Sequence, residues 1–430
     1  MRKMKYSGIE WIGQIPESWQ IDKAKHLFFN RNEKGNEISL ELLSPTQKYG
    51  VIPQSKYQEI TGMKPVQVSE DADLSTFKTV HAGDFCISLS AYMGGFEYST
   101  YEGVISPAYT SFYKIAELYD RYYMYLFKST TFIDEINKIT PQSVRVGRTT
   151  SYDKFAQVHL PVPPILVQRR IADFLEDKCG KIDRYIEKQQ KIIDKLKEYK
   201  QAVITEAVTK GLDPDAPMKD GGVTFVCEVP SHWSVIRFKY ITDAIGDGLH
   251  GTPEYDSDGE YYFLNGNNIG NENLVFKDNT DRISEFEYKK YKPVNISENT
   301  ILITLNGATY GKTSFYHNEK ILLGKSAGYI TLKNGENKCF VRFYMQSNIA
   351  RLIMELSLCG STIANLSLKT LNEFVMPYPP LYEQEQIVEY LTAKCSEIDR
   401  AIDKKESLIE KLTEYKKSLI YEAVTGKLEV

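Results

Sequence analysis

Hydrophobic residues follow a seven-residue period along two long stretches of the chain. In the first stretch, residues 168–208, there is no proline, and Gly180 is the single glycine. Two interleaved series of apolar residues run through it, interrupted by polar residues at Gln189 and Lys200. The series consist of Leu175, Ile182, Leu196 and Val203, and of Cys179, Ile186, Ile193 and Ala207. This spacing predicts a helix of ~40 residues, roughly 60 Å long, whose apolar seam packs on another helix.

The second stretch is a copy of the first. Residues 161–209 align without a gap with residues 377–425, at an offset of 216, and 24 of the 49 positions are identical. The second seam consists of Leu391, Ile398, Leu412 and Leu419, and of Cys395, Ile402, Ile409 and Ala423. Each copy opens with a proline cluster, which a helix tolerates at its start but not inside. Shared helical composition does not explain so many identities, so the chain contains a tandem duplication.

The duplication divides the chain into constant and variable parts. Residues 14–19 resemble residues 228–233, so each half begins with a proline–tryptophan element and ends with the same helix. Between these markers, residues 40–150 and 255–365 share almost no alignable sequence. A linker rich in turn-forming residues, 211–217, separates the halves. We expect four parts: residues 1–158, 159–212, 213–374 and 375–430.

The variable parts have the pattern of mixed domains. Runs at 84–89, 300–305 and 327–332 are β-branched or aromatic and are bounded by turn formers, as short strands are. Helical stretches follow near 119–139 and 341–358. The predicted fold class is therefore α+β, with two mixed α/β domains joined by two long helices. We expect these helices to pair as an antiparallel coiled coil in a pseudo-two-fold repeat. The alternative is that they are ordinary members of a helical bundle.

The net charge of −4 argues mildly against a stand-alone nucleic-acid binder, which needs basic groups to neutralise phosphates. Binding to DNA would require local basic groups, or a partner that contacts the backbone. The six cysteines lie far apart without a CxxC pair, and the chain has neither a leader-like start nor an apolar run of membrane-spanning length. These features predict a cytoplasmic protein.

No catalytic set is recognisable. Residues 307–313 look like a phosphate-binding loop, but the motif needs a glycine where Asn306 stands, and the residues that follow do not have a helical pattern. Asp281 with Glu287 and Lys289 mimics a metal-nuclease triad, a spacing that arises by chance in so charged a chain. The histidines lack metalloprotease spacing, and no glycine-rich cofactor loop opens a strand–helix unit. We therefore expect a chain that binds no cofactor or metal and directs chemistry performed elsewhere.

Several loops of the variable parts carry groups that hydrogen-bond to base edges. They are residues 47–50 and 142–148 in the first half, and 248–253 and 265–268 in the second. Asn and Gln can read adenine with two hydrogen bonds, and Arg can read guanine. Most polar loops are only connections, so this pattern alone is a weak indication.

The order of two variable parts and two repeated helices resembles the specificity (S) subunit of type I restriction-modification systems. The resemblance covers essentially the whole chain. Its motifs are the opening residues 8–19, the proline clusters 161–164 and 377–380 with Gln168 and Gln384, and the segments 246–253 and 307–312. The first variable part carries residues 90–96 where the second carries 307–312, so the two are expected to read different sequences.

The resemblance implies a division of labour. Each variable domain would read one half of a bipartite, asymmetric site in double-stranded DNA, and the helices would set the gap and dock two methyltransferase (M) subunits. The M subunits would hold S-adenosylmethionine and flip an adenine out of the duplex for N6 methylation. Restriction (R) subunits, which use ATP and Mg, would join where the system has them. The chain itself would be non-catalytic.

The resemblance and the polar loops together select candidate residues. We expect contacts to DNA from Lys48, Tyr49, Tyr92, Arg145, Arg148, His250, Thr252, Asn267, Asn268, Tyr310, Lys312 and Lys325. We expect the helix seam and the subunit-docking surface to involve Pro163, Gln168, Leu175, Ile182, Ile186, Ile193, Leu196, Pro379, Gln384, Leu391, Ile398, Ile402, Ile409 and Leu412.

Two other functions stay open at this point. A coiled-coil scaffold with variable protein-binding domains would suit the 30 tyrosines, but it would show no site-dependent retention of DNA. A nucleotide-driven enzyme would bind nucleotide through residues 307–313 and lose that binding on Lys312→Ala.

Overall fold

The structure, a computed structural model, describes residues 2–35, 40–63, 65, 74–88, 95–140, 150–223, 226–291, 296–358 and 365–430. The chain divides into two compact units. Unit 1 comprises Met1–Gln189 and Ser407–Val430, and unit 2 comprises Gln190–Glu406. Each unit therefore contains one variable part together with segments of both repeated helices, and the two tandem halves of the sequence are not the structural units.

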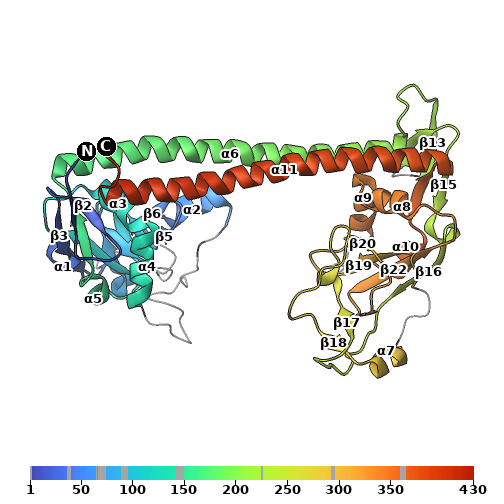
Figure 1. Cartoon of the computed structure of the whole chain (residues 1–430), viewed down its shortest axis with the longest axis horizontal. Coiled ribbons are helices and arrows are strands. Elements are labelled where there is room, and N and C mark those ends of the chain that lie inside the picture. The colour runs from blue at the N-terminus through green and yellow to red at the C-terminus, as the bar shows by residue number, and fades with distance from the viewer. Residues whose placement is uncertain are drawn as a thin grey trace. The chain divides into compact units, whose positions relative to one another are not determined.

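The two long helices predicted from the heptads are present as α6 (Ile165–Lys210) and α11 (Leu381–Val424). In each unit a segment of α6 lies beside a segment of α11 (Figure 1). In unit 1, Lys416 Nζ lies 2.6 Å from both carboxylate oxygens of Asp183. In unit 2, Lys200 Nζ lies 2.7 and 2.6 Å from those of Asp399. Since 183 + 216 = 399 and 200 + 216 = 416, the two ion pairs are copies of one contact, as antiparallel pairing of a repeat requires.

The seam side chains face inward. The buried seam side chains are Leu175, Cys179, Ile193, Val203, Ala207, Leu391, Cys395, Ile398, Ile402, Leu419 and Ala423. The half-buried ones are Ile182, Ile186, Leu196, Ile409 and Leu412. Full burial of such a side chain stabilises by about 1.5–3 kcal/mol, whereas a partly exposed ion pair contributes at most about 1 kcal/mol. The apolar seam therefore supplies most of the pairing energy, and the repeated lysine–aspartate pairs favour one register.

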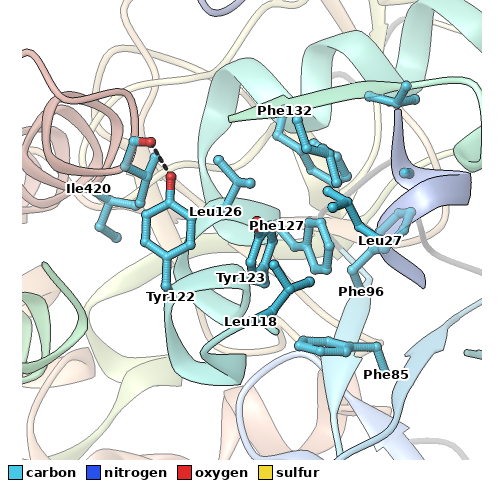
Figure 2. Close-up of a cluster of buried hydrophobic side chains, with 14 of the residues drawn as sticks. Leu27, Phe85, Phe96, Leu118, Tyr122, Tyr123, Leu126, Phe127, Phe132 and Ile420 are labelled. Atoms are coloured by element: carbon cyan, nitrogen blue, oxygen red, sulfur yellow. Dashed lines mark hydrogen bonds between the residues drawn. The ribbon is translucent and has the colours of Figure 1, made fainter. Parts of the chain in front are cut away.

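The variable domain of unit 1 is built on an antiparallel sheet with the strand order β4-β11-β8-β9. Its strands are β4 (Phe28–Arg31), β8 (Phe85–Ile87), β9 (Phe96–Tyr98) and β11 (Thr110–Lys114). Helix α3 (Asp120–Lys128) packs on the sheet through aromatic rings, because Phe127 lies 5.3 Å from Phe85 and 5.5 Å from Phe96 between ring centroids. Helix α4 (Thr130–Ile139) follows and adds Phe132, 4.9 Å from Phe127, to the same core (Figure 2).

The variable domain of unit 2 repeats this plan with an unrelated sequence. Its sheet has the order β16-β22-β19-β20. The strands are β16 (Thr242–Asp247), β19 (Thr300–Thr304), β20 (Thr313–Phe315) and β22 (Ala327–Leu332). A helix pair, α8 (Lys338–Met345) and α9 (Asn348–Ser357), follows the sheet as α3 and α4 do in unit 1. A buried serine, Ser129 or Ser347, stands between the two helices of each pair, so one predicted helical stretch is two helices in each domain.

The remaining elements complete each unit. In unit 1 they are β1 (Met4–Tyr6), β2 (Gln14–Pro16), β3 (Gln20–Lys23), α1 (Ala24–Leu27), β5 (Leu43–Thr46), β6 (Gly50–Pro53), α2 (Gln54–Thr61), η1 (Leu74–Thr76), β7 (Lys78–Val80), β10 (Gly103–Ile105), α5 (Tyr152–Phe155) and β12 (His159–Val162). In unit 2 they are β13 (Met218–Val223), β14 (Val226–Pro230), β15 (Ser234–Arg237), η3 (Phe238–Tyr240), β17 (Tyr261–Leu264), η4 (Gly266–Asn268), β18 (Arg282–Ile283), α7 (Glu285–Tyr291), β21 (Ile321–Leu323), α10 (Leu368–Asn372) and β23 (Val375–Tyr378).

The proline–tryptophan elements close the ends of the long helices. Gly211, just beyond α6, has a φ of +78°, and a Cβ there would lie 3.1 Å from the buried Trp233. Gly426, just beyond α11, has a φ of +73°, and its Cβ would lie 2.5 Å from Pro16. Left-handed backbone and close packing together require glycine at both positions. The proline–tryptophan element of residues 14–19 therefore packs on the end of α11, within unit 1.

The described residues include no helix that is both long enough and apolar enough to cross a membrane.

Candidate nucleic-acid interface

Four strands of the unit 2 sheet have loops at the same end. Strands β16 and β19 finish there, at Asp247 and Thr304, and strands β20 and β22 start there, at Thr313 and Ala327. Neighbouring strands of this sheet are antiparallel, so these four termini lie together. We call this end of the sheet, with its connecting loops, the loop end.

Backbone hydrogen bonds hold the loops of the loop end together. Leu249 N donates to Leu323 O at 2.7 Å, and Gly248 N donates to Ala327 O at 2.9 Å. Leu305 N donates to Ser326 O at 2.9 Å.

The Ser326 hydroxyl also accepts a hydrogen bond from Gly266 N at 2.8 Å. The segments 248–253, 265–268, 305–312 and 324–326, which are far apart in the sequence, therefore form one surface.

All seven second-half residues predicted to contact DNA lie in these segments. Those with exposed side chains are His250, Thr252, Asn267, Lys312 and Lys325, and those that are half-buried are Asn268 and Tyr310. The structure thus brings the second-half candidates together at the loop end.

Three of the seven are already engaged inside the domain. The Asn268 amide donates to Val275 O at 3.0 Å and accepts from Asn265 N at 3.0 Å, so it fixes the loop. His250 Nε2 lies 2.6 Å from an Asp247 carboxylate oxygen. Tyr310 packs against the core of the domain. These side chains shape the loop end, and Thr252, Asn267, Lys312 and Lys325 have the more accessible polar groups.

Close packing requires the glycine that begins the 246–253 motif. A Cβ at Gly246 would lie 2.4 Å from the ring of Tyr329, which crosses the backbone of β16. Burial, followed by the nearby carboxylate of Asp247, raises the pKa of the Tyr329 hydroxyl. Any larger residue at position 246 would displace this tyrosine from the start of the loop.

Residues 305–312 form the turn of a hairpin and not a phosphate loop. Gly307 and Gly311 have φ values of +83° and +79°, which the turn requires. The segment continues into strand β20, so it lacks the helix N-terminus that would hold a phosphate. Among the described residues, no group of three His, Cys, Asp or Glu side chains is arranged to hold a metal ion.

The first-half candidates are not brought together in the same way. Tyr92, Arg145 and Arg148 lie outside the described residues. Lys48 and Tyr49 lie on the β5–β6 turn, where Lys48 Nζ is 5.2 Å from the centre of the Tyr49 ring. The structure therefore leaves the composition of a loop end in unit 1 as a prediction, although the strand order of its sheet matches that of unit 2.

Four of the residues predicted for the helix seam and the subunit-docking surface are buried at the starts of the long helices. Gln168 Nε2 donates to Pro163 O at 2.8 Å, and Gln384 Nε2 donates to Pro379 O at 2.9 Å. All four of these side chains are buried, so they position the long helices and cannot form a docking surface.

An exposed aromatic patch on each unit was missed by the sequence reasoning. In unit 2, Tyr199 and Tyr390 are 49% and 41% exposed, and the Lys394 ammonium lies near both. The pKa of Lys394 is raised first by Glu397 and further by these tyrosines.

The residues at the corresponding positions of unit 1, called here the patch of unit 1, are Tyr415, which is 58% exposed, Lys178 and the half-buried Phe174. Lys178 Nζ lies 5.7 Å from the Phe174 ring centre. Each member is the unit 2 residue shifted by 216 positions. The sequence could have indicated these patches, because the tyrosine at position 199 is repeated at position 415 of the second copy.

Comparison with known proteins agrees with the resemblance inferred from the sequence. Residues 230–413 match the type I restriction modification DNA specificity domain. The MjaVIII specificity subunit of Methanocaldococcus jannaschii, a type I restriction enzyme chain, is 23% identical over 97% of this chain and 94% of that one. The EcoBI specificity subunit of Escherichia coli is 25% identical over 63% of this chain and 58% of that one.

Solved structures with the same fold include a chain of a type I restriction-modification system, with a TM-score of 0.71 at 16% identity, covering 96% of this chain and 99% of that one. The HsdS subunit from Thermoanaerobacter tengcongensis gives a TM-score of 0.50 at 16% identity, covering 98% and 100%. These structures share the fold of this chain, and the match to the DNA specificity domain lies in residues 230–413. The chain is thus similar, over nearly its whole length, to type I restriction enzyme specificity subunits, and residues 230–413 match the DNA specificity domain of that family.

Proposed function

We propose that this chain is the sequence-reading subunit of a type I complex in which unit 1 and unit 2 each read one half of a bipartite, asymmetric DNA site. Residues 1–158 and 213–374 would be the two target-recognition domains, and residues 159–212 and 375–430 the helical parts that set the gap. The observation that carries this proposal is the convergence of four polar loops at the end of the unit 2 sheet.

The loop end suits base reading in physical terms. Its amide and hydroxyl groups can read base edges in the major groove, and Lys312 and Lys325 can contact phosphates or guanine. Both sheets have the same strand order but unrelated loop sequences, so the two units are expected to read different half-sites.

The chain would direct chemistry that partner subunits perform. We propose that two M subunits carry S-adenosylmethionine for adenine-N6 methylation, and that they also neutralise DNA phosphates, which offsets the net charge of −4. Restriction subunits would add ATP-dependent activity where the system has them.

The two aromatic patches support a ratio of two M subunits to one chain. Tyrosine is one of the residue types enriched among the anchors of protein interfaces. Since the same patch occurs once on each unit, each is proposed to dock one M subunit.

The test begins with a map of methylated adenines in the DNA of the source cells, which gives the two half-sites. The assembled complex is then titrated with a duplex that carries both halves and with duplexes in which either half is scrambled. We expect Lys312→Ala to weaken binding of the intact site about 3- to 10-fold and to lower the salt dependence by about one phosphate contact.

The matched control is Lys333→Ala, because Lys333 follows β22 at the opposite end of the same sheet and donates to Tyr240 O. It is expected to bind as the unchanged chain does. A complex that retains intact and doubly scrambled duplexes equally would contradict the proposed function and favour the scaffold alternative.

A further inference from the structure

Two asparagines that are 59 positions apart in the sequence meet at the loop end of unit 2. Asn306, in the hairpin turn, forms an isolated antiparallel bridge with Asn365. The next residues inward are also joined, because Leu366 N donates to Leu305 O at 2.7 Å. Neither asparagine stands in a motif, and their approach depends on the fold alone.

The bridge fixes the direction of both asparagine side chains. Leu305 and Leu366 are 3% and 1% exposed and pack in the core of the domain. Side chains of successive extended residues point to opposite sides, and directly opposed residues of an antiparallel pair point to the same side. Because Leu305 and Leu366 point into the core, Asn306 and Asn365 point together away from it.

The two amides have their hydrogen-bonding groups available. Asn365 is exposed and Asn306 is half-buried, and neither side chain forms a hydrogen bond with another described residue. In this they differ from Asn268, whose amide is bonded on both sides within its own loop. Opposed Cβ atoms in such a pair lie about 4.5–5.5 Å apart, and successive base pairs lie about 3.4 Å apart, so the two amides can reach the same base pair or adjacent base pairs.

We propose that Asn306 and Asn365 form a preorganised amide pair that reads adenine in the half-site bound by unit 2. This inference rests on the proposed function, and it names two residues of unit 2 and the base that they would read. An asparagine amide donates to adenine N7 and accepts from adenine N6 at the same time, a pairing that the other bases do not offer in the major groove. Anchoring on two buried leucines removes most of the entropy cost that a mobile loop would incur on binding.

The experiment uses the full complex of this chain with its methyltransferase subunits and a DNA library in which both half-sites are randomised. Methylated molecules are selected and sequenced for the unchanged chain, Asn306→Ala and Asn365→Ala. We expect each variant to lose preference for adenine at one position, or at two adjacent positions, of the unit 2 half-site by about 5- to 150-fold. Preferences in the other half-site are expected to remain.

The matched control is Asn334→Ala, because Asn334 is exposed just beyond β22 at the opposite end of the sheet. Asn365→Asp is a second variant that keeps the shape but removes the donor, and it is expected to abolish the adenine preference as well. Circular dichroism and retention of the M subunits report whether each variant is folded.

The possible results separate this inference from the proposed function. If the asparagine variants select the same bases as the unchanged chain, the amide pair does not read DNA, whereas the bipartite specificity stands. A uniform loss of methylation without a change in base preference also overturns the inference. If the unchanged complex selects no bipartite sequence, the proposed function itself is wrong.

Discussion

At the scale of single residues, one buried tyrosine ties the variable domain of unit 1 to the end of a repeated helix. The Tyr122 hydroxyl on α3 donates to Val424 O at 2.6 Å, and Val424 is the last residue of α11 (Figure 2). The carbonyls in the last turn of a helix have no partner within the helix, so this hydroxyl satisfies a group that burial would otherwise leave unpaired. The corresponding position in unit 2 is Phe340, and α6 continues two residues beyond Val208, the counterpart of Val424.

We predict that Tyr122→Phe lowers the free energy of unfolding by about 1–3 kcal/mol, because the Val424 carbonyl remains buried without its donor. Chemical denaturation followed by tryptophan fluorescence measures the loss. Tyr123→Phe is the matched control, because Tyr123 is equally buried on the same helix. Its hydroxyl donates a longer and weaker hydrogen bond to Pro161 O, at 3.3 Å, so a smaller loss of unfolding free energy is expected. Equal losses in the two variants would show that the short hydrogen bond has no particular role.

At the scale of elements, the long helices were the most predictable part of the molecule. Their heptads place every seam residue by local spacing alone, and the proline clusters and terminal glycines mark their ends. The loop end of unit 2 was predictable only as a set of polar segments, because its geometry depends on strand pairing between residues far apart in the sequence. The bridge between Asn306 and Asn365 could not be predicted from the sequence, because no local pattern connects two residues so far apart in the chain.

Two adjacent isoleucines on α6 allow a direct test of the seam. Ile193 is 1% exposed and Ile192 is 38% exposed. We predict that Ile193→Ala lowers the free energy of unfolding by about 2–5 kcal/mol, since it removes buried methyl groups and leaves a cavity. Ile192→Ala is expected to change it by less than about 0.5 kcal/mol, because the side chain is accessible and alanine favours the helix. Similar losses at both positions, measured by denaturant unfolding, would contradict the assignment of the seam.

At the scale of the whole molecule, the repeat distributes one set of features over both units. The lysine–aspartate pair between the helices, the proline–tryptophan closure of a helix end and the exposed aromatic patch each occur once in each unit. The strand order of the sheet is also repeated, although the variable sequences have diverged beyond alignment. The same strand order can be built from different sequences, because it requires buried apolar positions but not particular side chains, and so the two variable parts share a topology without alignable sequence.

The repeated patch predicts the stoichiometry of the complex. Tyr199→Ala and Tyr415→Ala are each expected to weaken one of two M-subunit sites by about 2 kcal/mol, the scale of an interface anchor. Native mass spectrometry at limiting M subunit is then expected to shift from two bound subunits to one for either variant, and to none for the double variant. Tyr240→Ala serves as the control and is expected to retain both, because Tyr240 is an exposed tyrosine in η3, outside the two long helices. Loss of both subunits from a single substitution would argue against independent docking sites.

The division of the chain into units also has a consequence for its biosynthesis. Unit 2 is one continuous segment, whereas unit 1 needs its first 189 residues together with the last 24, from Ser407 to Val430. Domains fold as units while the ribosome extends the chain from the N-terminus. Unit 1 therefore starts before unit 2 and is completed after it, and until residues 407–430 have been synthesised its buried helix face has no partner. A chaperone that shields apolar surface on nascent chains would find its longest-lived target at the N-terminal end of this protein.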